Sequence, residues 1–196
     1  QILPPDVNRS HKEWRGRKNK IRMGFMSIKR LQQKAVDGIM DERKAGEFDS
    51  LADFLQRVEL DLADAMSLTN AGCFKSLAPE LTHRELAYRV AGFYLQNGVR
   101  EPLTTSPVNN KLSDEDQYRL ELDAFGYPLS IHPLEKYRPV LSRRIKFARE
   151  IPLFVGQSIY LIGVYITRKE TVTGNSEPME FLTLEDETDI YECVLF

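Results

Sequence analysis

The sequence contains little cysteine and no long hydrophobic run. Its two cysteines, Cys73 and Cys193, lie far apart without CxxC spacing, which speaks against a disulfide framework and against a zinc site. No apolar run approaches the ~20 residues that a membrane-spanning helix needs. The opening residues, QILPP, lack the basic-then-apolar order of a signal peptide. These absences predict a cytoplasmic protein with no membrane partner.

Clustered catalytic residues are also missing. The three histidines, His11, His83 and His132, stand in three different segments. No pair of carboxylates has a spacing suited to holding two metal ions, and no nucleophile, base and metal ligands gather in one segment. We therefore expect this chain to be catalytically inactive by itself, and to hold no cofactor or metal.

The basic residues are distributed unevenly. The chain has 27 Lys or Arg and 29 Asp or Glu, a net charge of −2. Residues 9–34 hold ten basic residues and one acidic residue, Glu13, so the remainder is clearly acidic. Clustered cations of this kind commonly bind nucleic-acid phosphates through counterion release. A solvated charged loop is the alternative interpretation.

Helical spacing dominates the first two thirds of the chain. Residues 14–20 predict a polar loop. Gly46 and Gly72 each follow an apolar stretch of helical period and predict the end of a helix. Ser50 and Thr82 each begin a capping-box pattern, which predicts the start of a helix. The periodicity predicts helices over 31–40, 51–58, 62–68, 82–93, 113–122 and 134–141.

The pattern changes to strands after Gly156. Residues 158–169, 179–184 and 190–196 alternate between two faces, with the turns TVTGNSEP and EDETD between them. We predict three strands of a small barrel. Because the last strand would present an unpaired edge at Phe196, we expect a fragment whose sheet continues beyond it.

Six segments occur in the order found in bacterial DNA polymerase III alpha subunits and their error-prone relatives. They are ILPPDVNRS, IRMGFMSIK, GEFDSLADFLQRV, LTNAGCFKSL, ELDAFGYPLSIHPLEKY and MEFLTLEDETDIYECVLF. The chain therefore resembles a C-terminal fragment of this family over nearly its whole length.

The resemblance implies an α+β fold, in which a mainly α helix-hairpin-helix domain is followed by a helical linker and a partial OB-fold β-barrel. Residues 1–98 are expected to form the end of the fingers and a tandem helix-hairpin-helix domain. Residues 99–156 would be a linker with helices, and 157–196 the first OB strands.

The resemblance also implies function. The chain would be a nucleic-acid-binding portion of a DNA-directed DNA polymerase, a nucleotidyltransferase of DNA replication or translesion synthesis. The catalytic aspartates of the family's palm are absent from this chain, so the magnesium would be bound elsewhere. The expected partner is DNA, as duplex and at the OB region as single strand, with other polymerase subunits as further partners. Residues 99–113 contain no Gln-x-x-Leu-Phe-like peptide, so a sliding-clamp partner lacks support. The replicative and error-prone roles both remain open.

The first hairpin departs from the family pattern. Gly-x-Gly usually follows the SIK run, whereas this chain has Arg30-Leu31-Gln32. Glycine allows backbone N–H groups to approach a phosphate closely, so we expect side chains to replace those donors. The second hairpin retains its glycine. The candidate residues for duplex DNA are Arg17, Lys18, Lys20, Arg22, Lys29, Arg30, Lys34 and Gly72.

The predicted barrel supplies candidates for single-stranded DNA. If Leu182 and Leu184 point into the barrel, alternation places Phe181 on the opposite face. Phe181 would then stack on a base, as the aromatic platforms of OB folds do; the alternative is that it fills the core. Arg168 and Lys169 are the candidate phosphate contacts.

Two other functions fit part of the sequence. FLTLEDETDIYECVLF also resembles the anticodon-binding OB domain of class II tRNA synthetases, which would make the chain a tRNA-binding protein but leaves its helical half unexplained. A protein-docking scaffold is the second alternative. Preference for duplex DNA, preference for tRNA, or no salt-dependent binding would distinguish the three.

Overall fold

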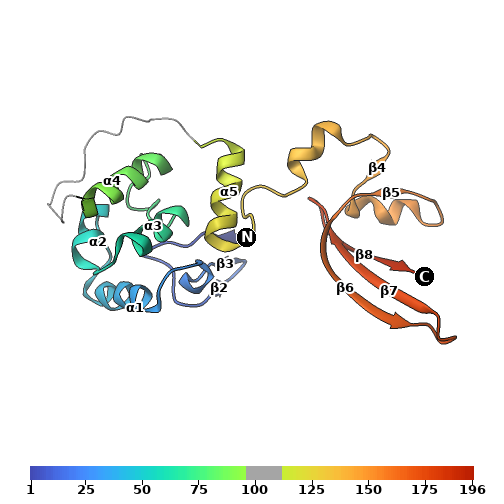
Figure 1. Cartoon of the computed structure of the whole chain (residues 1–196), viewed down its shortest axis with the longest axis horizontal. Helices are drawn as coiled ribbons and strands as arrows, with labels where there is room; N and C mark the ends of the chain where they lie inside the picture. The colour runs from blue at the N-terminus through green and yellow to red at the C-terminus, as the bar shows by residue number, and fades with distance from the viewer. Residues whose placement is uncertain (96–111) are drawn as a thin grey trace. The chain divides into compact units, whose positions relative to one another are not determined.

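The computed structural model describes residues 1–95 and 112–196, which divide into two compact units, Gln1–Leu129 and Ser130–Phe196 (Figure 1). Both helices and strands occur, so the predicted α+β class is confirmed. Within these residues no helix has the length and apolar character needed to cross a membrane.

The first unit opens with a small three-stranded sheet. Strand β1 (Ile2–Leu3) pairs in parallel with β3 (Lys20–Arg22), and β2 (Arg15–Arg17) pairs with β3 in antiparallel. We name the β2–β3 hairpin the ribbon. The polar loop predicted over 14–20 is therefore wrong. The sequence did not predict these strands because strand prediction relies on alternating apolar residues, and Ile21 is the one apolar side chain of the ribbon. Backbone pairing holds the two strands together.

Helices follow the ribbon in the described residues of the first unit, and those predicted there are confirmed. Ser50 Oγ accepts a hydrogen bond from Asp53 N at 3.1 Å, and Thr82 and Glu85 form the expected reciprocal cap. The elements are η1 (Phe25–Ser27), α1 (Gln33–Glu42), η2 (Arg43–Ala45), α2 (Leu51–Arg57), α3 (Leu62–Asn70), α4 (His83–Leu95) and α5 (Asp114–Phe125).

An aromatic row forms the centre of the first core. The rings of Phe48 and Phe54 meet edge to face at 4.8 Å, and those of Phe54 and Phe74 at 4.9 Å. The same core includes Phe125 of α5. Helix α5, expected within the linker 99–156, thus packs in the first unit, because its apolar face is buried there. Residues 96–111 of the expected linker lie outside the described residues, and the three domain boundaries stay predictions.

The second unit contains two separate sheets. Strands β4 (Ile145–Lys146) and β5 (Tyr160–Leu161) pair in parallel. The three predicted strands are confirmed as an antiparallel meander of β6 (Val164–Val172), β7 (Pro178–Glu185) and β8 (Ile190–Leu195), although the first is interrupted before β6. Whether this sheet belongs to an OB barrel stays a prediction.

Two short 3-10 helices accompany these sheets, η3 (Glu135–Val140) and η4 (Ala148–Phe154). The helix predicted over 134–141 is thus a 3-10 helix, η3. It contains Pro139, which has no N–H to donate to an α-helical bond.

The acidic turn between β7 and β8 is structural. Asp186 accepts hydrogen bonds from the N–H groups of Thr188 and Asp189, and from Ala148 at the start of η4. Burial alone would raise the pKa of Asp186, but these hydrogen bonds and that of the Thr188 hydroxyl lower it below its ordinary value. Glu187 pairs with Arg138. The turn therefore joins η3, η4 and the sheet.

Replacing Gly163 by alanine should destabilise the second unit by about 1–3 kcal/mol, because a new Cβ overpacks a filled site. That Cβ would lie 2.7 Å from Leu184 Cβ and 2.7 Å from Tyr191 Oη. Hydrogen exchange of the β7 amides measures the effect. Gly174→Ala is the control, since no atom lies within 4 Å of its new Cβ. Equal exchange rates in both variants would contradict the prediction.

Candidate nucleic-acid interface

The candidate residues of the first unit lie in three places: the ribbon, the turn before α1 together with the first turn of that helix, and the turn after α3. In the ribbon, Lys18 and Asn19 form the two-residue turn that joins the strands, and Lys18 has φ 56°. Arg17 and Lys20 flank this turn on opposite strands. Arg22 is anchored at the base, where its Nη1 donates to Pro4 O at 2.9 Å.

The turn before α1 contains Lys29 and Arg30. Arg30 is exposed and has φ 63°, in the left-handed region where glycine is the usual residue. Lys29 N donates to Ala124 O at 2.7 Å. The Lys29 side chain lies over Gly126 at the end of α5, where a helix favours cations. Both side chains are exposed, and that of Lys29 lies against the end of α5, so Arg30 is the residue that we consider for a ligand contact.

A buried carboxylate holds the other end of this turn. Gln32 N donates to Asp64 Oδ1 at 2.9 Å, and Asp64 is only 5% exposed. Gln32 Nε2 donates to Asp61 Oδ2 at 3.2 Å, and Asp61 Oδ1 caps α3 through Asp64 N. Gln32 stands where the family pattern has its second glycine, and its N–H is thus bonded within the protein.

Helix α1 begins directly after this turn. The N–H groups of its first turn, at Gln33 and Lys34, have no acceptor within the helix, and the helix dipole makes this end favourable for anions. Lys34 pairs with Glu59 at 3.9 Å, but both side chains are so exposed that the pair is weak. Arg30, Lys34 and the start of α1 together form a cationic surface, which we name the α1 turn.

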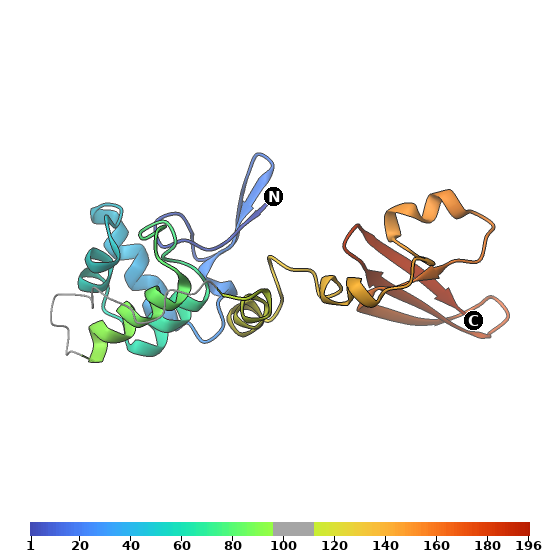
Figure 2. The same cartoon turned by 90° about the horizontal axis from the view of Figure 1, so that it is seen from above.

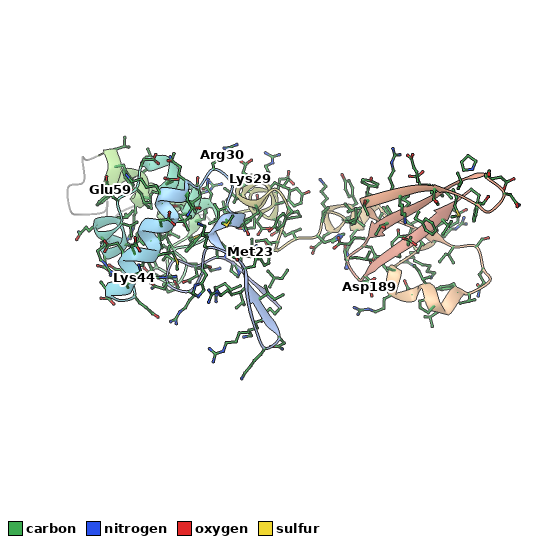
Figure 3. All side chains as sticks on the ribbon, turned by 90° about the horizontal axis from the view of Figure 1, so that it is seen from below. Met23, Lys29, Arg30, Lys44, Glu59 and Asp189 are labelled. Atoms are coloured by element: carbon green, nitrogen blue, oxygen red, sulfur yellow. The ribbon has the colours of Figure 1, made fainter. Side chains whose placement is uncertain are left out.

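The seven predicted cations do not form one surface. Figure 3 shows Lys29 and Arg30 on one side of the first unit and the ribbon standing out from the other side. The ribbon also protrudes from the unit in Figure 2. The structure thus separates Arg17, Lys18, Lys20 and Arg22 from the α1 turn.

Gly72 lies in the second hairpin, after α3. Its φ of 74° requires glycine-like freedom, and its N–H donates to Thr69 O at 2.9 Å. No atom lies within 4 Å of a Cβ placed there. Gly72 is therefore needed for the turn's conformation, and the space beside it is open.

The sheet of the second unit brings together two of its three candidates. Phe181 pairs with Lys169 of β6 and with Val194 of β8, so these side chains share a face, and Phe181 is half-buried. Arg168 pairs with Leu182 and lies on the opposite face. There it forms ion pairs with Glu170 at 3.2 Å and Glu180 at 3.7 Å.

Sequence analysis missed two basic groups. Arg15 lies directly opposite Arg22 in the ribbon, and only strand register could have assigned it. In the second unit, Arg143, Lys146 and Phe147 line a depression of about 450 Å³, which Arg138 and Glu150 also border. The sequence RRIKF was the available signal for the second group.

Comparisons with known proteins agree with the motif order. Residues 1–86 match the family described as helix-hairpin-helix motif. The whole chain is 27% identical over 202 residues to a DNA polymerase III subunit alpha of Aquifex aeolicus, and 32% identical over 224 residues to that of Thermus aquaticus. An error-prone DNA polymerase of Anaeromyxobacter dehalogenans is 29% identical over 180 residues, which cover 89% of the chain.

The chain spans only 16–18% of the length of these relatives. The resemblance to polymerases of the DNA polymerase III alpha type and the error-prone type is nevertheless confirmed, since it extends over all or most of the chain. The matched helix-hairpin-helix residues include the ribbon, the α1 turn and Gly72.

Arg30→Gly should be about 1 kcal/mol more stable than Arg30→Ala, because both remove the guanidinium but only glycine relieves the left-handed backbone. Urea unfolding followed by Trp14 fluorescence measures the difference. Equal midpoints would show that this turn carries no such strain.

Asp64→Ala should cost about 1–3 kcal/mol, because it leaves Gln32 N–H without its buried acceptor. Asp64→Asn keeps an acceptor oxygen and should lose less. The same unfolding measurement compares them. Equal losses would mean that the carboxylate charge, rather than the hydrogen bond, stabilises the turn.

Proposed function

We propose, from the premise that this chain corresponds to a portion of a DNA polymerase III alpha-type polymerase, that its first unit binds the backbone of duplex DNA. The relatives' names support DNA as the polymer, and residues 1–86 match the helix-hairpin-helix motif. In this proposal the chain binds DNA during replication or translesion synthesis. Nucleotidyl transfer and the magnesium that it needs belong to residues outside the chain.

The α1 turn is the observation that carries the proposal. Arg30 is exposed and has a left-handed backbone conformation just before α1. Lys34 lies in the first turn of that helix. A guanidinium and a helix N-terminus both favour a phosphate oxygen. Contacts of this kind position a protein on DNA without reading its sequence.

The turn's rigid setting also supports this role. Lys29 N–H is bonded to Ala124 O on one side of Arg30, and Gln32 N–H to Asp64 on the other. A fixed turn loses little conformational freedom when it meets a phosphate. Because Gln32 N–H is already engaged, the Arg30 side chain has to supply the contact that the family's glycine-rich nest would make.

We propose a single-strand contact for the second unit. Phe181 and Lys169 are adjacent on one face, and an aromatic ring beside a cation suits a base and its phosphate. Arg168 is left out of this proposal, because its charge is directed to Glu170 and Glu180 on the other face. Titration with a single-stranded oligonucleotide tests this arm.

Arg30→Ala should weaken duplex binding by about 1 kcal/mol, roughly fivefold, as loss of a charge-assisted hydrogen bond would. Arg30→Gly/Gln32→Gly should recover only part of that affinity, because the N–H of residue 32 stays bonded to Asp64 and only the N–H groups of residues 30 and 31 can then approach the phosphate. Fluorescence anisotropy of a labelled 20-base-pair duplex at two salt concentrations measures both. Contact with about four phosphates predicts a slope of log K against log salt near −3.6.

Lys44→Gln is the matched control, because Lys44 is an exposed cation away from the α1 turn (Figure 3). Equal effects of Arg30→Ala and Lys44→Gln would mean that the turn is not a specific contact. Preference for tRNA over duplex DNA would favour the synthetase-like alternative, and salt-independent or absent binding would favour the docking scaffold.

We propose that this binding needs no cofactor. Arginine, lysine and backbone N–H groups contact phosphate directly, without a bridging metal. The same titration in excess EDTA should therefore give the same affinity, and a loss of affinity in EDTA would contradict this.

A further inference from the structure

The ribbon carries an arrangement of charge that the α1 turn does not explain. We propose that the face of the ribbon formed by Arg15, Arg17, Lys20 and Arg22 is a second nucleic-acid contact, which binds backbone phosphates separately from the α1 turn. This inference rests on the proposed function, because it assigns a second surface of the same unit to the same polymer.

Strand register places the four cations together. Arg15 pairs with Arg22, and Arg17 with Lys20. Side chains of directly paired residues, and of residues two apart on one strand, point to the same face of a sheet. The four cations therefore share one face, and the pair between them, Gly16 and Ile21, belongs to the other.

This arrangement is unfavourable for the isolated protein. Like charges directly opposite each other in a sheet are destabilising, and here two such pairs are adjacent. None of the ion pairs formed within residues 1–95 and 112–196 involves these four side chains. A polyanion along this face would remove the repulsion and release its own counterions.

The shape of the ribbon suits a backbone contact. All residues from Lys12 to Ile21 are exposed, and Figures 2 and 3 show the hairpin projecting beyond the helices. Lys18, at the tip, adds a fifth cation in a strained left-handed conformation.

The ribbon and the α1 turn are independent contacts in this proposal. They lie on opposite sides of the unit, so they bind different stretches of backbone (Figure 3). Substitutions at two distant sites with no shared partner have additive effects. The loss from a ribbon variant should therefore be the same in the presence and in the absence of Arg30.

The test compares variants of the full 196-residue chain by anisotropy, on a labelled 20-base-pair duplex and on a single strand of equal length, across a salt series. Arg15→Thr/Arg17→Thr removes two ribbon cations and keeps strand-forming residues. Lys44→Gln/Arg119→Gln removes two exposed cations elsewhere in the unit and serves as the control.

The ribbon variant should reduce the magnitude of the salt slope by about 1.8, which corresponds to two released phosphates. Its affinity for duplex should fall about tenfold or more at low salt, against a small change in the control. Its thermal unfolding midpoint should be unchanged or higher, because a like-charge pair is relieved. A purely structural role for Arg15 and Arg17 would lower that midpoint instead.

Each outcome separates the two proposals. Loss in the ribbon variant but not in Arg30→Ala supports the ribbon and overturns the α1 turn. If Arg30→Ala loses affinity for DNA while the ribbon variant and the control variant have equal affinities, the ribbon proposal alone is overturned. No salt-dependent binding by the wild type to either probe overturns both. An equal loss on single strand and duplex assigns the ribbon to backbone in either form, and a loss confined to one probe assigns it to that form.

Discussion

The hydrogen bond from Gln32 N–H to the buried Asp64 carboxylate is the constraint around which the α1 turn, the proposed binding surface of the first unit, is organised. It joins the start of α1 to the start of α3, and Asp61 caps α3 at the same point. On the other side of the turn, Lys29 N–H binds the end of α5. Arg30 is thus presented outward between two fixed points, and its left-handed backbone is maintained by its neighbours rather than by its own preference.

This constraint changes how the first hairpin can meet a phosphate. A glycine-rich hairpin offers several N–H groups to a phosphate. Here the N–H of Gln32 is hydrogen-bonded to Asp64, and arginine occupies position 30, where the left-handed backbone favours glycine. Side-chain contact reaches further and tolerates less exact placement than backbone contact, but it is screened more by salt. In the proposed contact, the departure from the family pattern therefore makes binding depend less on backbone geometry and more on side-chain charge.

The sequence predicted most helices because their signals are local. Ser50 and Thr82 cap the helices they were expected to cap, since a cap depends on residues three positions apart. The ribbon was missed because its pairing is not visible in the polarity of its residues. The placement of α5 and the separation of the cations depend on tertiary packing, which no local pattern encodes. Alternation did place Phe181 opposite Leu182, but it could not show that Arg168 is held by Glu170 and Glu180.

Both cationic surfaces of the first unit contain locally unfavourable features, and the features differ. Lys18 and Arg30 have left-handed backbones without being glycine, and the ribbon places like charges face to face. Nothing in the core requires these choices, because the Phe48, Phe54 and Phe74 row and the helix caps stabilise the unit independently of them. Departures from local preference at exposed cations, on a scaffold that is otherwise consistent, are typical of sites selected for binding rather than for stability. The two surfaces share this property although they lie on different sides of the unit, which is why we assign both to the same polyanion.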